Sequence, residues 1–262
     1  MNLKNKIALV TGASDQRGIG FAIAKALINQ GATVAISDLP RRLPELNEAV
    51  AVLGDNATAV ALDITDEDAV IDAGLSIKSQ LGNIDILVNN AGSPAGCHPF
   101  LETTSRQWAS SWQVNIMGTV NCCKAVLPDM QAQNSGVIIN ISSLQGLRSS
   151  AAYGAYTTHK HALIGMTRTL ACEFGKQNIR VLAVCPGVIN TAMNDLQVQK
   201  LAADSGVDPS KIEAAMGKNC AMNRIGQPQE IANVVAFLAS DNASYMNGNA
   251  IEVGGGFITG MS

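Results

Sequence analysis

The stretch IALVTGASDQRGIGFAIAKALINQ, residues 7 to 30, decides the fold. An apolar run of the kind found in buried strands leads into a glycine-rich turn, and a helical pattern follows. Such a turn directs backbone N–H groups and the positive end of the helix toward a pyrophosphate. Five residues separate Gly12 from Gly18, and Arg17 directly precedes Gly18. We therefore expect a lengthened phosphate-binding loop at this point of the chain.

The alternation of strand and helix continues to the end of the sequence. Seven apolar runs predict strands, namely KIALVTG (6–12), ATVAISD (32–38), ATAVALD (57–63), DILVNNAG (85–92), GVIINISS (136–143), IRVLAVCPG (179–187) and GNAIEVGG (248–255). Helical patterns cover residues 21–30, 66–81, 106–130, 155–174 and 228–240. Because the strands are apolar throughout, we expect a Rossmann-like α/β fold, a doubly wound seven-stranded parallel sheet with helices on both faces.

The segment from about 188 to 227 is the one irregular region, rich in Asn, Asp, Lys and Gly. Such a long excursion inside a compact domain is usually functional. We interpret it as a lid over the substrate. No internal repeat or linker divides the sequence, so we expect one dinucleotide-binding and catalytic domain over residues 1–262.

The composition narrows the class of protein. Hydrophobic residues make up 47% of the sequence and charged residues 15%, which favours a well-filled core. The formal net charge is −3 without a basic block, which argues against nucleic acid or an anionic membrane as partner. We find no secretion signal and no apolar stretch of membrane-spanning length, and we expect a cytoplasmic protein. The six cysteines lack metal-ligand spacing, and we expect no metal site.

Polar side chains end the strands that follow the glycine loop. Asp38 ends the second predicted strand, eighteen residues after Gly20, where a carboxylate can accept hydrogen bonds from ribose hydroxyls. Asp63 ends the third strand, where it could face an adenine edge, and Asn90 lies in the NNAG sequence that ends the fourth. Open α/β sheets bind ligands at the carboxyl ends of their strands. These residues therefore predict a dinucleotide site.

Tyr156 and Lys160 lie four residues apart, on one face of a predicted helix. An amphipathic helix with a surface lysine would show the same spacing, but the pair suits proton transfer to an alcohol or carbonyl oxygen. Lowering the pKa of a phenol from about 10 to about 7 needs roughly 4 kcal/mol. One cation at about 4 Å supplies about that much at an effective dielectric constant near 20. Ser143, thirteen residues before Tyr156, could hold the substrate oxygen.

Taken together and in this order, the motifs resemble those of the short-chain dehydrogenase/reductase family. They are TG…GIG in the glycine loop, NNAG, VN at Val114–Asn115, ISS before Gly146, YTTHK, and PGVINT at 186–191. The resemblance extends to RIGQPQEIANVVAFLAS and GNAIEVGGG, so it covers essentially the whole chain. Together the motifs are highly specific, although each alone is not.

The resemblance implies a catalytic set of Asn115, Ser143, Tyr156 and Lys160. In this set, Tyr156 would be the general acid and base, and Lys160 would lower its pKa and hold the nicotinamide ribose. Ser143 would orient the substrate oxygen, and Asn115 would anchor a water that relays protons to Lys160.

The expected dinucleotide site draws on every loop at this edge of the sheet. The predicted binding residues are Gly12, Ser14, Arg17, Gly18, Ile19, Gly20, Asp38, Leu39, Asp63, Ile64, Asn90, Ala91, Gly92, Tyr156, Lys160, Pro186, Gly187, Ile189 and Thr191. Two features depart from the family pattern. The glycine loop has two residues more than the usual three between its first two glycines, and Gly254 stands where an aspartate is common.

Residues at the adenosine end favour NAD over NADP. In NADP-preferring relatives basic residues of the glycine loop bind the 2′-phosphate, and Arg17 with Arg41 or Arg42 could do so here. Asp38 opposes this, because a carboxylate repels a phosphate by several kcal/mol even at a dielectric constant near 20. An arginine on a solvated loop offers only about 0–1 kcal/mol in return. We therefore expect NAD, with Arg17 solvated or beside the pyrophosphate and the extra loop residues bulging toward the adenosine end.

The expected reaction is hydride transfer between NAD(H) and a small secondary alcohol or ketone, such as a polyol, a sugar or a cyclic or aryl alcohol. Segments 93–99, 144–153 and 188–227 should face this substrate, with His98 reaching toward it. Ketoacyl reductases of the family that act on carrier-bound chains tend to carry arginines where this chain has Asn134 and Gln177. We therefore favour a free small molecule over a 3-oxoacyl chain.

Two other functions stay open at this point. Tyr153 and Lys160 show the Tyr-x6-Lys spacing of the related enoyl reductases, which reduce carbon–carbon double bonds, although NNAG and Ser143 weigh against them. A non-catalytic dinucleotide sensor would need none of the four catalytic-type residues.

We also expect a homotetramer, or at least a dimer. The helical segments 106–130 and 155–174 are apolar on more than one face, and similar enzymes pair these helices between subunits.

Overall fold

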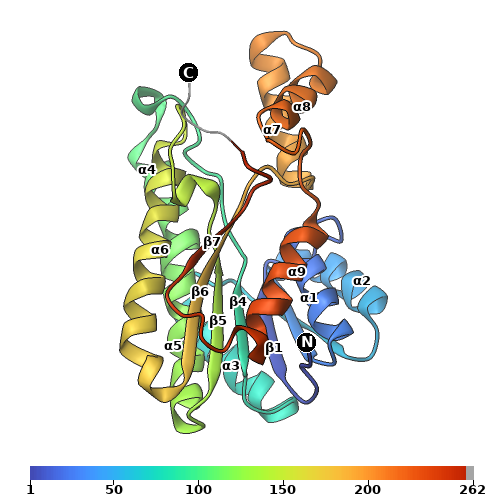
Figure 1. Ribbon diagram of the computed structural model, residues 1–262, viewed down its shortest axis with the longest axis vertical. Helices are drawn as coiled ribbons and strands as arrows, with labels where there is room; N and C mark the ends of the chain where they lie inside the picture. Colours follow the sequence, from blue (N-terminus) through green and yellow to red (C-terminus); the bar gives the residue numbers. More distant parts are fainter. Residues whose placement is uncertain (258–262) are drawn as a thin grey trace.

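A seven-stranded parallel sheet forms the centre of residues 1–257, the part of the chain that the computed structural model describes (Figure 1). The spatial order of the strands is β3-β2-β1-β4-β5-β6-β7. Their bounds are β1 (Ile7–Thr11), β2 (Thr33–Asp38), β3 (Ala57–Ala61), β4 (Ile86–Asn89), β5 (Gly136–Ile141), β6 (Ile179–Pro186) and β7 (Ala250–Val253). The predicted fold class is confirmed. Residues 258–262 of the predicted domain lie outside the described residues.

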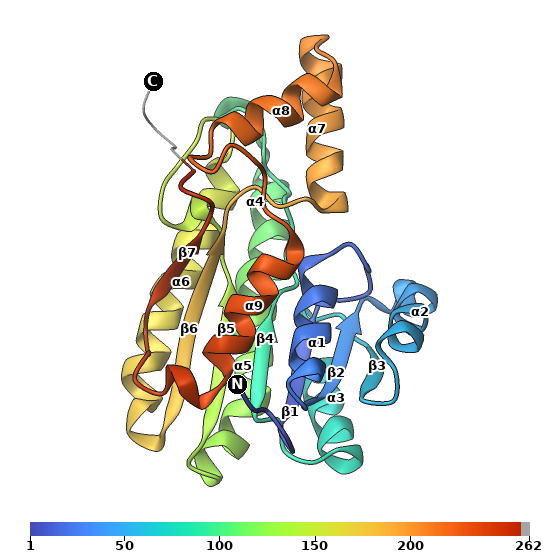
Figure 2. The ribbon, with the colours of Figure 1, turned by 45° about the vertical axis from the view of Figure 1, so that its right-hand side comes forward.

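Helices cover both faces of this sheet (Figure 2). Their bounds are α1 (Ile19–Asn29), α2 (Leu43–Leu53), α3 (Glu67–Gln80), α4 (Ser105–Trp112), α5 (Gly118–Ala132), α6 (Gly154–Phe174), α7 (Ala192–Ser205), α8 (Pro209–Lys218) and α9 (Pro228–Ala239). One buried core joins the sheet to α1, α2 and α9, and a second joins it to α3, α5 and α6.

Alternate residues of each central strand enter the two cores. In β1, Val10 lies in the core with α1 and α9, whereas Leu9 lies in the core with α3 and α5. Side chains alternate across a strand, so a strand covered on both faces must be apolar at every position. This requirement explains why the strands were visible in the sequence as unbroken apolar runs.

The segment 188–227 contains two helices, α7 and α8, and the expectation of an irregular region was wrong. Thr191 caps α7 by accepting a hydrogen bond from the backbone of Asn194, and Gly206 ends it with φ +68°. Asp208 caps α8, and Pro209 occupies its first turn. These capping residues are the Asn, Asp and Gly enrichment that suggested a loop, because the same residue types begin and end short helices.

The predicted helix 106–130 is divided into α4, a π-helical turn over Gln113–Met117, and α5. A hydrophobic pattern does not reveal one extra residue in a turn, because the apolar face continues on either side. The interruption matters because it contains Asn115, one of the predicted catalytic residues.

Candidate active site

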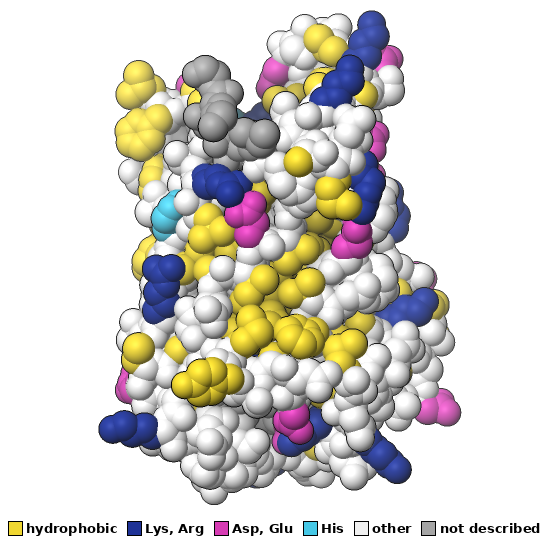
Figure 3. Space-filling view, viewed as in Figure 1, with side chains coloured by type: hydrophobic (Ala, Val, Ile, Leu, Met, Phe, Trp, Pro, Cys, Tyr) yellow, Lys and Arg dark blue, Asp and Glu magenta, His cyan; other side chains and the backbone are white. Residues whose placement is uncertain are grey.

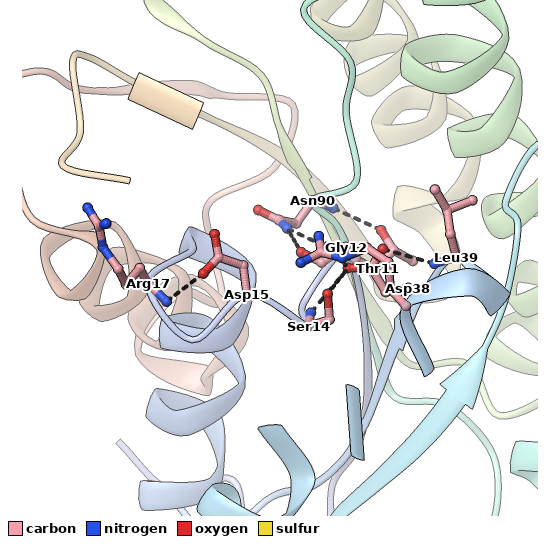
Figure 4. Close-up of polar contacts among 9 residues, drawn as sticks. Thr11, Gly12, Ser14, Asp15, Arg17, Asp38, Leu39 and Asn90 are labelled. Carbon is pink, nitrogen blue, oxygen red and sulfur yellow. Dashed lines mark hydrogen bonds and ion pairs between the residues drawn. The ribbon is translucent and has the colours of Figure 1, made fainter. Parts of the chain in front are cut away.

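The strand order reverses between β1 and β4, and the loops after these two strands are held together by hydrogen bonds. The hydroxyl of Thr11 accepts hydrogen bonds from the backbone N–H groups of Asn90 and Ala91, both at 3.1 Å. The side-chain amide of Asn90 donates to the carbonyl oxygens of Thr11 at 2.9 Å and Gly12 at 2.8 Å (Figure 4). The glycine loop and the NNAG segment are thus one structural unit at the carboxyl edge of the sheet, where such folds bind ligands.

Two glycines of this unit have no room for a side chain. A Cβ atom on Gly12, which has φ +66°, would lie 2.8 Å from the Cα atom of Ala91. A Cβ atom on Gly20 would lie 2.5 Å from the amide nitrogen of Asn90 and 2.6 Å from the carbonyl oxygen of Gly12. The close packing brings the loop backbone to the sheet edge and leaves its outer side for a ligand.

The amino end of α1 is suited to an anion. Its N-cap is Gly18, no side chain of the described residues caps it, and its first turn holds no acidic residue. The first N–H groups of an α-helix have no partner within the helix, and the helix dipole favours negative charge there. A pyrophosphate therefore fits this position, as the glycine pattern predicted.

The extra residues of the glycine loop form a tight turn. The backbone N–H of Gly18 donates to the carbonyl oxygen of Asp15 at 2.8 Å, and the N–H of Arg17 donates to the Asp15 carboxylate at 2.9 Å. The guanidinium of Arg17 pairs with Asp195 of α7 at 2.8 Å, whereas Ser14 points toward Asp38 (Figure 4). The loop therefore does not bulge toward the adenosine end as expected; only Ser14 faces that end.

Asp38 is held firmly at the end of β2. One carboxylate oxygen accepts hydrogen bonds from the hydroxyl of Ser14 at 2.6 Å and from its backbone N–H at 3.2 Å. The other accepts the backbone N–H of Leu39 at 2.9 Å, and Arg42 lies 3.8 Å away as an ion-pair partner. These contacts fix the orientation of a carboxylate that is only 10% exposed.

Two other predicted residues have local roles. Asp63 accepts hydrogen bonds from the backbone and hydroxyl of Thr65, at 3.0 and 2.7 Å. The side chain of Ile64 is buried against Gly118 at the start of α5, and its carbonyl oxygen accepts a hydrogen bond from Asn121 at 3.0 Å. Neither the side chain nor the carbonyl oxygen of Ile64 therefore faces the expected dinucleotide.

The four predicted catalytic side chains come together around Gly92. A Cβ atom on Gly92 would lie 3.1 Å from the side-chain oxygen of Asn115 and 3.6 Å from Nζ of Lys160. That Nζ atom lies 5.5 Å from the centre of the Tyr156 ring, and the hydroxyl of Ser143 is close enough to Tyr156 to lower its pKa. The residues come from the π-helical turn, the end of β5 and α6, so the sheet and both helices must pack correctly to assemble the set.

Burial has the larger effect on the ionisation of this group. It raises the pKa of Tyr156 to about 12, against the lowering effect of the Ser143 hydrogen bond. It also lowers the pKa of Lys160 to about 8. The pKa of Tyr156 therefore stays above its usual value although Lys160 lies over its ring, because burial disfavours the phenolate, and Lys160 by itself does not bring the phenol near neutrality. A further positive charge, such as that of an oxidised nicotinamide, would be needed.

Lys160 and Asn115 are fixed by backbone contacts. Lys160 donates from Nζ to the carbonyl oxygen of Ile141 at 2.9 Å. The side-chain oxygen of Asn115 accepts the backbone N–H of Ser93 at 3.2 Å, and its amide donates to the carbonyl oxygen of Ser93 at 2.9 Å. The amide also donates to the carbonyl oxygen of Ser111 at 2.9 Å, the acceptor that a regular α-helix would offer to the backbone N–H of Asn115.

The loop after β6 completes this edge of the sheet. Gly187 packs closely against Gly254, because a Cβ atom on Gly187 would lie 2.8 Å from the Cα atom of Gly254. A Cβ atom on Gly254, the position where an aspartate is common, would in turn lie 2.9 Å from the Cδ1 atom of Leu144. Ile189 is buried in the core, and Thr191 caps α7.

Helix α7 contacts the segments expected to face the substrate. Gln197 is hydrogen-bonded to the hydroxyl of Tyr153. The ring of Tyr153 lies edge-on to that of Tyr156, with the two centroids 6.4 Å apart. Lys200 contacts the carbonyl oxygen of Cys97 at 3.3 Å and the imidazole of His98 at 3.1 Å. Sequence reasoning placed the segment here but did not single out Gln197 or Lys200, since isolated polar residues on a short helix carry no motif.

Within residues 1–257, no group of three or more His, Cys, Asp or Glu side chains is placed to hold a metal ion. None of the helices described is long and apolar enough to cross a membrane.

Comparison with known proteins identifies the family. The family model described as enoyl-(acyl carrier protein) reductase matches residues 12–258. The chain is 36% identical over 256 residues to oxidoreductase UcpA of Escherichia coli K12, covering 97% of this chain and 95% of that protein. It is 34% identical over 259 residues to 3-oxoacyl-[acyl-carrier-protein] reductase FabG of Thermotoga maritima, covering 98% and 100%.

Solved structures agree with these sequence matches. NAD⁺-bound xylitol dehydrogenase superposes with a TM-score of 0.91 at 34% identity, covering 98% of this chain and 100% of that one. L-sorbose reductase from Gluconobacter frateurii, complexed with NADPH and L-sorbose, gives a TM-score of 0.90 at 30% identity, covering 100% and 99%. The chain belongs to the short-chain dehydrogenase/reductase family and is an oxidoreductase of that family, whose members bind a nicotinamide dinucleotide.

Replacing Gly20 by alanine should weaken dinucleotide binding by about tenfold or more, which corresponds to about 1.4 kcal/mol. The added methyl group would displace Asn90 and open the junction of the two loops. Titration calorimetry with the oxidised dinucleotide measures the effect. Gly165→Ala is the matched control, because nothing lies within 4 Å of its Cβ position on α6. Unchanged affinity of Gly20→Ala would contradict the close packing described above.

Proposed function

We propose that this protein is an NAD-dependent dehydrogenase and ketone reductase that acts on small secondary alcohols. The observation that carries the proposal is the convergence of Asn115, Ser143, Tyr156 and Lys160 beside the glycine loop. A phenol next to a buried ammonium and a hydroxyl is suited to moving a proton to or from an alcohol oxygen. A sensor that only bound the dinucleotide would need no such group.

Each residue has a defined part in the proposed reaction. During alcohol oxidation the Tyr156 phenolate accepts the hydroxyl proton of the substrate, and Ser143 donates a hydrogen bond to the same oxygen as it becomes a carbonyl. Lys160 stabilises the phenolate and, with Asn115, leads the proton onward through water. An oxidised nicotinamide dinucleotide bound beside Lys160 would supply the acceptor for the hydride of the carbinol carbon. Ketone reduction follows the same steps in reverse.

The dinucleotide would be held by residues of five loops. The pyrophosphate would bind the backbone of Gly18, Ile19 and Gly20 at the amino end of α1. The ribose of the adenosine would bind Asp38, and the nicotinamide end would contact Lys160 together with the loop after β6. These assignments follow the predicted binding residues, with the exception of the side chain of Ile64, which is buried in the core.

The contacts of Arg17 and Asp38 support NAD as the cofactor. Arg17 is paired with Asp195 on α7, away from Asp38, so its charge is directed away from the place of a 2′-phosphate. Asp38 is fixed by Ser14 and Leu39 with its charge at the ribose position. Arg42, at 3.8 Å from Asp38, offsets part of the repulsion against a phosphate, and the carboxylate still excludes it sterically and electrostatically.

Residues 188–227 are proposed as a lid. Helix α7 contacts the glycine loop through Asp195 and the segment before α6 through Gln197. It therefore touches both the cofactor side and the substrate side of the site. The Arg17–Asp195 pair is exposed, at 60% and 48% for the two side chains, and such a pair contributes about 0–1 kcal/mol. A contact this weak allows the lid to open for substrate entry.

Polar groups beside Tyr156 support a hydroxylated substrate. Tyr153 and Gln197 present a hydroxyl and an amide next to the catalytic phenol, and these can bind further hydroxyl groups of a polyol or sugar. Cyclic and aryl secondary alcohols remain within the proposed class. An alcohol panel with both dinucleotides, followed by nicotinamide absorbance, tests the proposal and identifies the substrate.

The structure gives less support to enoyl reduction. Lys160 lies over the ring of Tyr156, and the hydroxyl of Tyr153 is engaged with α7. The arrangement therefore favours the Tyr-x3-Lys pair as the catalytic one over the Tyr-x6-Lys pair.

The Tyr156→Phe variant should lose turnover by a factor of about 10² to 10⁴, because general acid–base catalysis contributes that much, and dinucleotide affinity should stay nearly unchanged. In the wild type, oxidation should speed up as the pH rises, because the phenolate is the active form and burial raises the pKa of Tyr156. Steady-state kinetics and a binding titration measure both effects. Tyr153→Phe is the control, and loss of activity there with retention in Tyr156→Phe would point to enoyl reduction instead.

Cofactor choice is tested with Asp38→Ala. We expect wild-type kcat/KM to be higher with NAD than with NADP, and Asp38→Ala to reduce that preference by about tenfold or more, because the carboxylate no longer repels the 2′-phosphate. Arg17→Ala serves as the comparison and should leave the preference almost unchanged. A wild-type preference for NADP would show that Asp38 does not determine the choice.

Apolar surface supports self-association. Hydrophobic side chains gather on the face formed by α9 and β7 (Figure 3), where Phe237 is 37% exposed and Ile251 and Val253 are partly exposed. Among the described residues, β7 is the last strand of the sheet, and an edge without a further strand next to apolar side chains favours a second copy. On α4, Trp112 is also exposed. We therefore propose a homotetramer, or at least a dimer.

Light scattering at micromolar protein concentration should give the mass of a tetramer or dimer. Phe237→Glu should lower that mass, because a carboxylate would be buried without a partner in the interface. Asn47→Glu, an exposed change on α2, adds the same charge away from this face and controls for altered surface charge. A monomeric wild type would contradict the proposal.

A further inference from the structure

A buried histidine lies directly before the catalytic lysine and plays no part in the chemistry described so far. His159 is 2% exposed, and its Nδ1 atom is 3.0 Å from the hydroxyl oxygen of Ser111, which is fully buried on α4. The same hydroxyl oxygen is 3.0 Å from the side-chain amide nitrogen of Asn115. His159, Ser111 and Asn115 thus form a continuous chain of hydrogen bonds from α6 through α4 to the π-helical turn.

The direction of these hydrogen bonds follows from Asn115. Its side-chain oxygen accepts from the backbone N–H of Ser93, and its amide donates to the carbonyl oxygen of Ser93, so the amide can have only one orientation. The amide nitrogen has two protons and three acceptors, the carbonyl oxygens of Ser93 and Ser111 and the hydroxyl oxygen of Ser111, so the two oxygens of Ser111 share one proton. A hydroxyl oxygen that accepts from the amide has its own single proton available, and Nδ1 of His159, at 3.0 Å, is placed to accept it. The imidazole is then neutral, with its proton on Nε2.

The surroundings of His159 favour the neutral ring. The rings of Trp108 and Trp112 on α4 lie edge-on to it, with centroids 5.9 and 5.5 Å away. On α6 itself, the ionisable group that affects the pKa of His159 is Lys160. On α4, the side chains that face His159 are the two tryptophans and Ser111, and none of them is charged. Burial first, and the ammonium of Lys160 second, lower the pKa of His159 below its usual 6.5.

We propose that His159 is a positioning residue, which holds the hydroxyl of Ser111 as an acceptor for Asn115 and so fixes the Asn115 side chain beside Lys160. The proposal rests on the function given above, in which Asn115 serves the proton path of the Tyr156–Lys160 pair. Protonation of His159 would turn Nδ1 into a donor, and the hydroxyl proton of Ser111 would then be forced toward the Asn115 amide. Asn115 would lose one of its three acceptors, and the π-helical turn would lose one of its ties to α6.

Four variants test the role of the acceptor. His159→Leu and Ser111→Ala remove the hydrogen bond, and we expect kcat to fall about tenfold in each, because misplaced catalytic groups lose rate, while KM changes less than about twofold. His159→Asn places an amide oxygen where Nδ1 lies and should return kcat to within about threefold of the wild type. His161→Leu is the matched control, because His161 is exposed on the same helix and should leave kcat unchanged.

The pH profile separates this role from simple packing. In ketone reduction, where protonated Tyr156 is the active form, the wild type should lose kcat as the pH falls through the lowered pKa of His159, and His159→Asn should lack that loss. The proposal is wrong if His159→Leu keeps the wild-type kcat. It is also wrong if His159→Asn is as slow as His159→Leu and still loses kcat as the pH falls.

Nuclear magnetic resonance of protein labelled with ¹⁵N-histidine gives a readout that does not depend on turnover. The chain has three histidines, and the His159 signal is assigned by its absence in His159→Asn. We expect Nδ1 of His159 to be unprotonated at neutral pH, and the side-chain amide signal of Asn115 to shift in His159→Leu but not in His161→Leu. A protonated Nδ1, or an unmoved Asn115 signal, would overturn the proposal. If the wild type shows these signals as expected but oxidises no alcohol, the proposed function alone is refuted.

Discussion

The junction between Thr11 and Asn90 is the constraint on which the rest of the site depends. Strands β1 and β4 are neighbours in the sheet, and the chain leaves them in opposite directions, so their loops would separate without a tie. The hydroxyl of Thr11 and the amide of Asn90 satisfy the backbone groups exposed by this divergence. Because these polar groups are partly buried, an unmade hydrogen bond would be costly, and the glycine loop is therefore held to the segment that leads to Gly92.

The catalytic side of the site is built on the same principle of satisfied buried polar groups. Lys160 is buried and donates a hydrogen bond to the carbonyl oxygen of Ile141. The side-chain amide of Asn115 donates a hydrogen bond to the carbonyl oxygen of Ser111, at the π-helical turn. Burial makes these side chains rigid and lowers the pKa of Lys160, and both effects favour a group that must move a proton at a fixed position. The cost is an arrangement that tolerates little change in the packing of α4 against α6.

Most of the fold could be predicted from the sequence, whereas several local features could not. The strands were visible because both faces of a covered parallel sheet require apolar residues, as Leu9 and Val10 show in β1. The π-helical turn at Asn115 was missed because its side chain replaces a backbone hydrogen bond, an event that leaves no periodic signal. Helices α7 and α8 were missed because their caps, such as Asp208, are also common in loops.

The sequence by itself determined the seven strands in their order along the chain, the glycine loop, and the Tyr156–Lys160 pair, because these depend on residues close together in the chain. Only the tertiary structure decided that Arg17 pairs with Asp195, 178 residues away, and that His159 meets Ser111, 48 residues away. Such contacts depend on how helices pack on the sheet and on one another. Local residue spacing carries no information about that packing, so it cannot predict which polar side chains will meet.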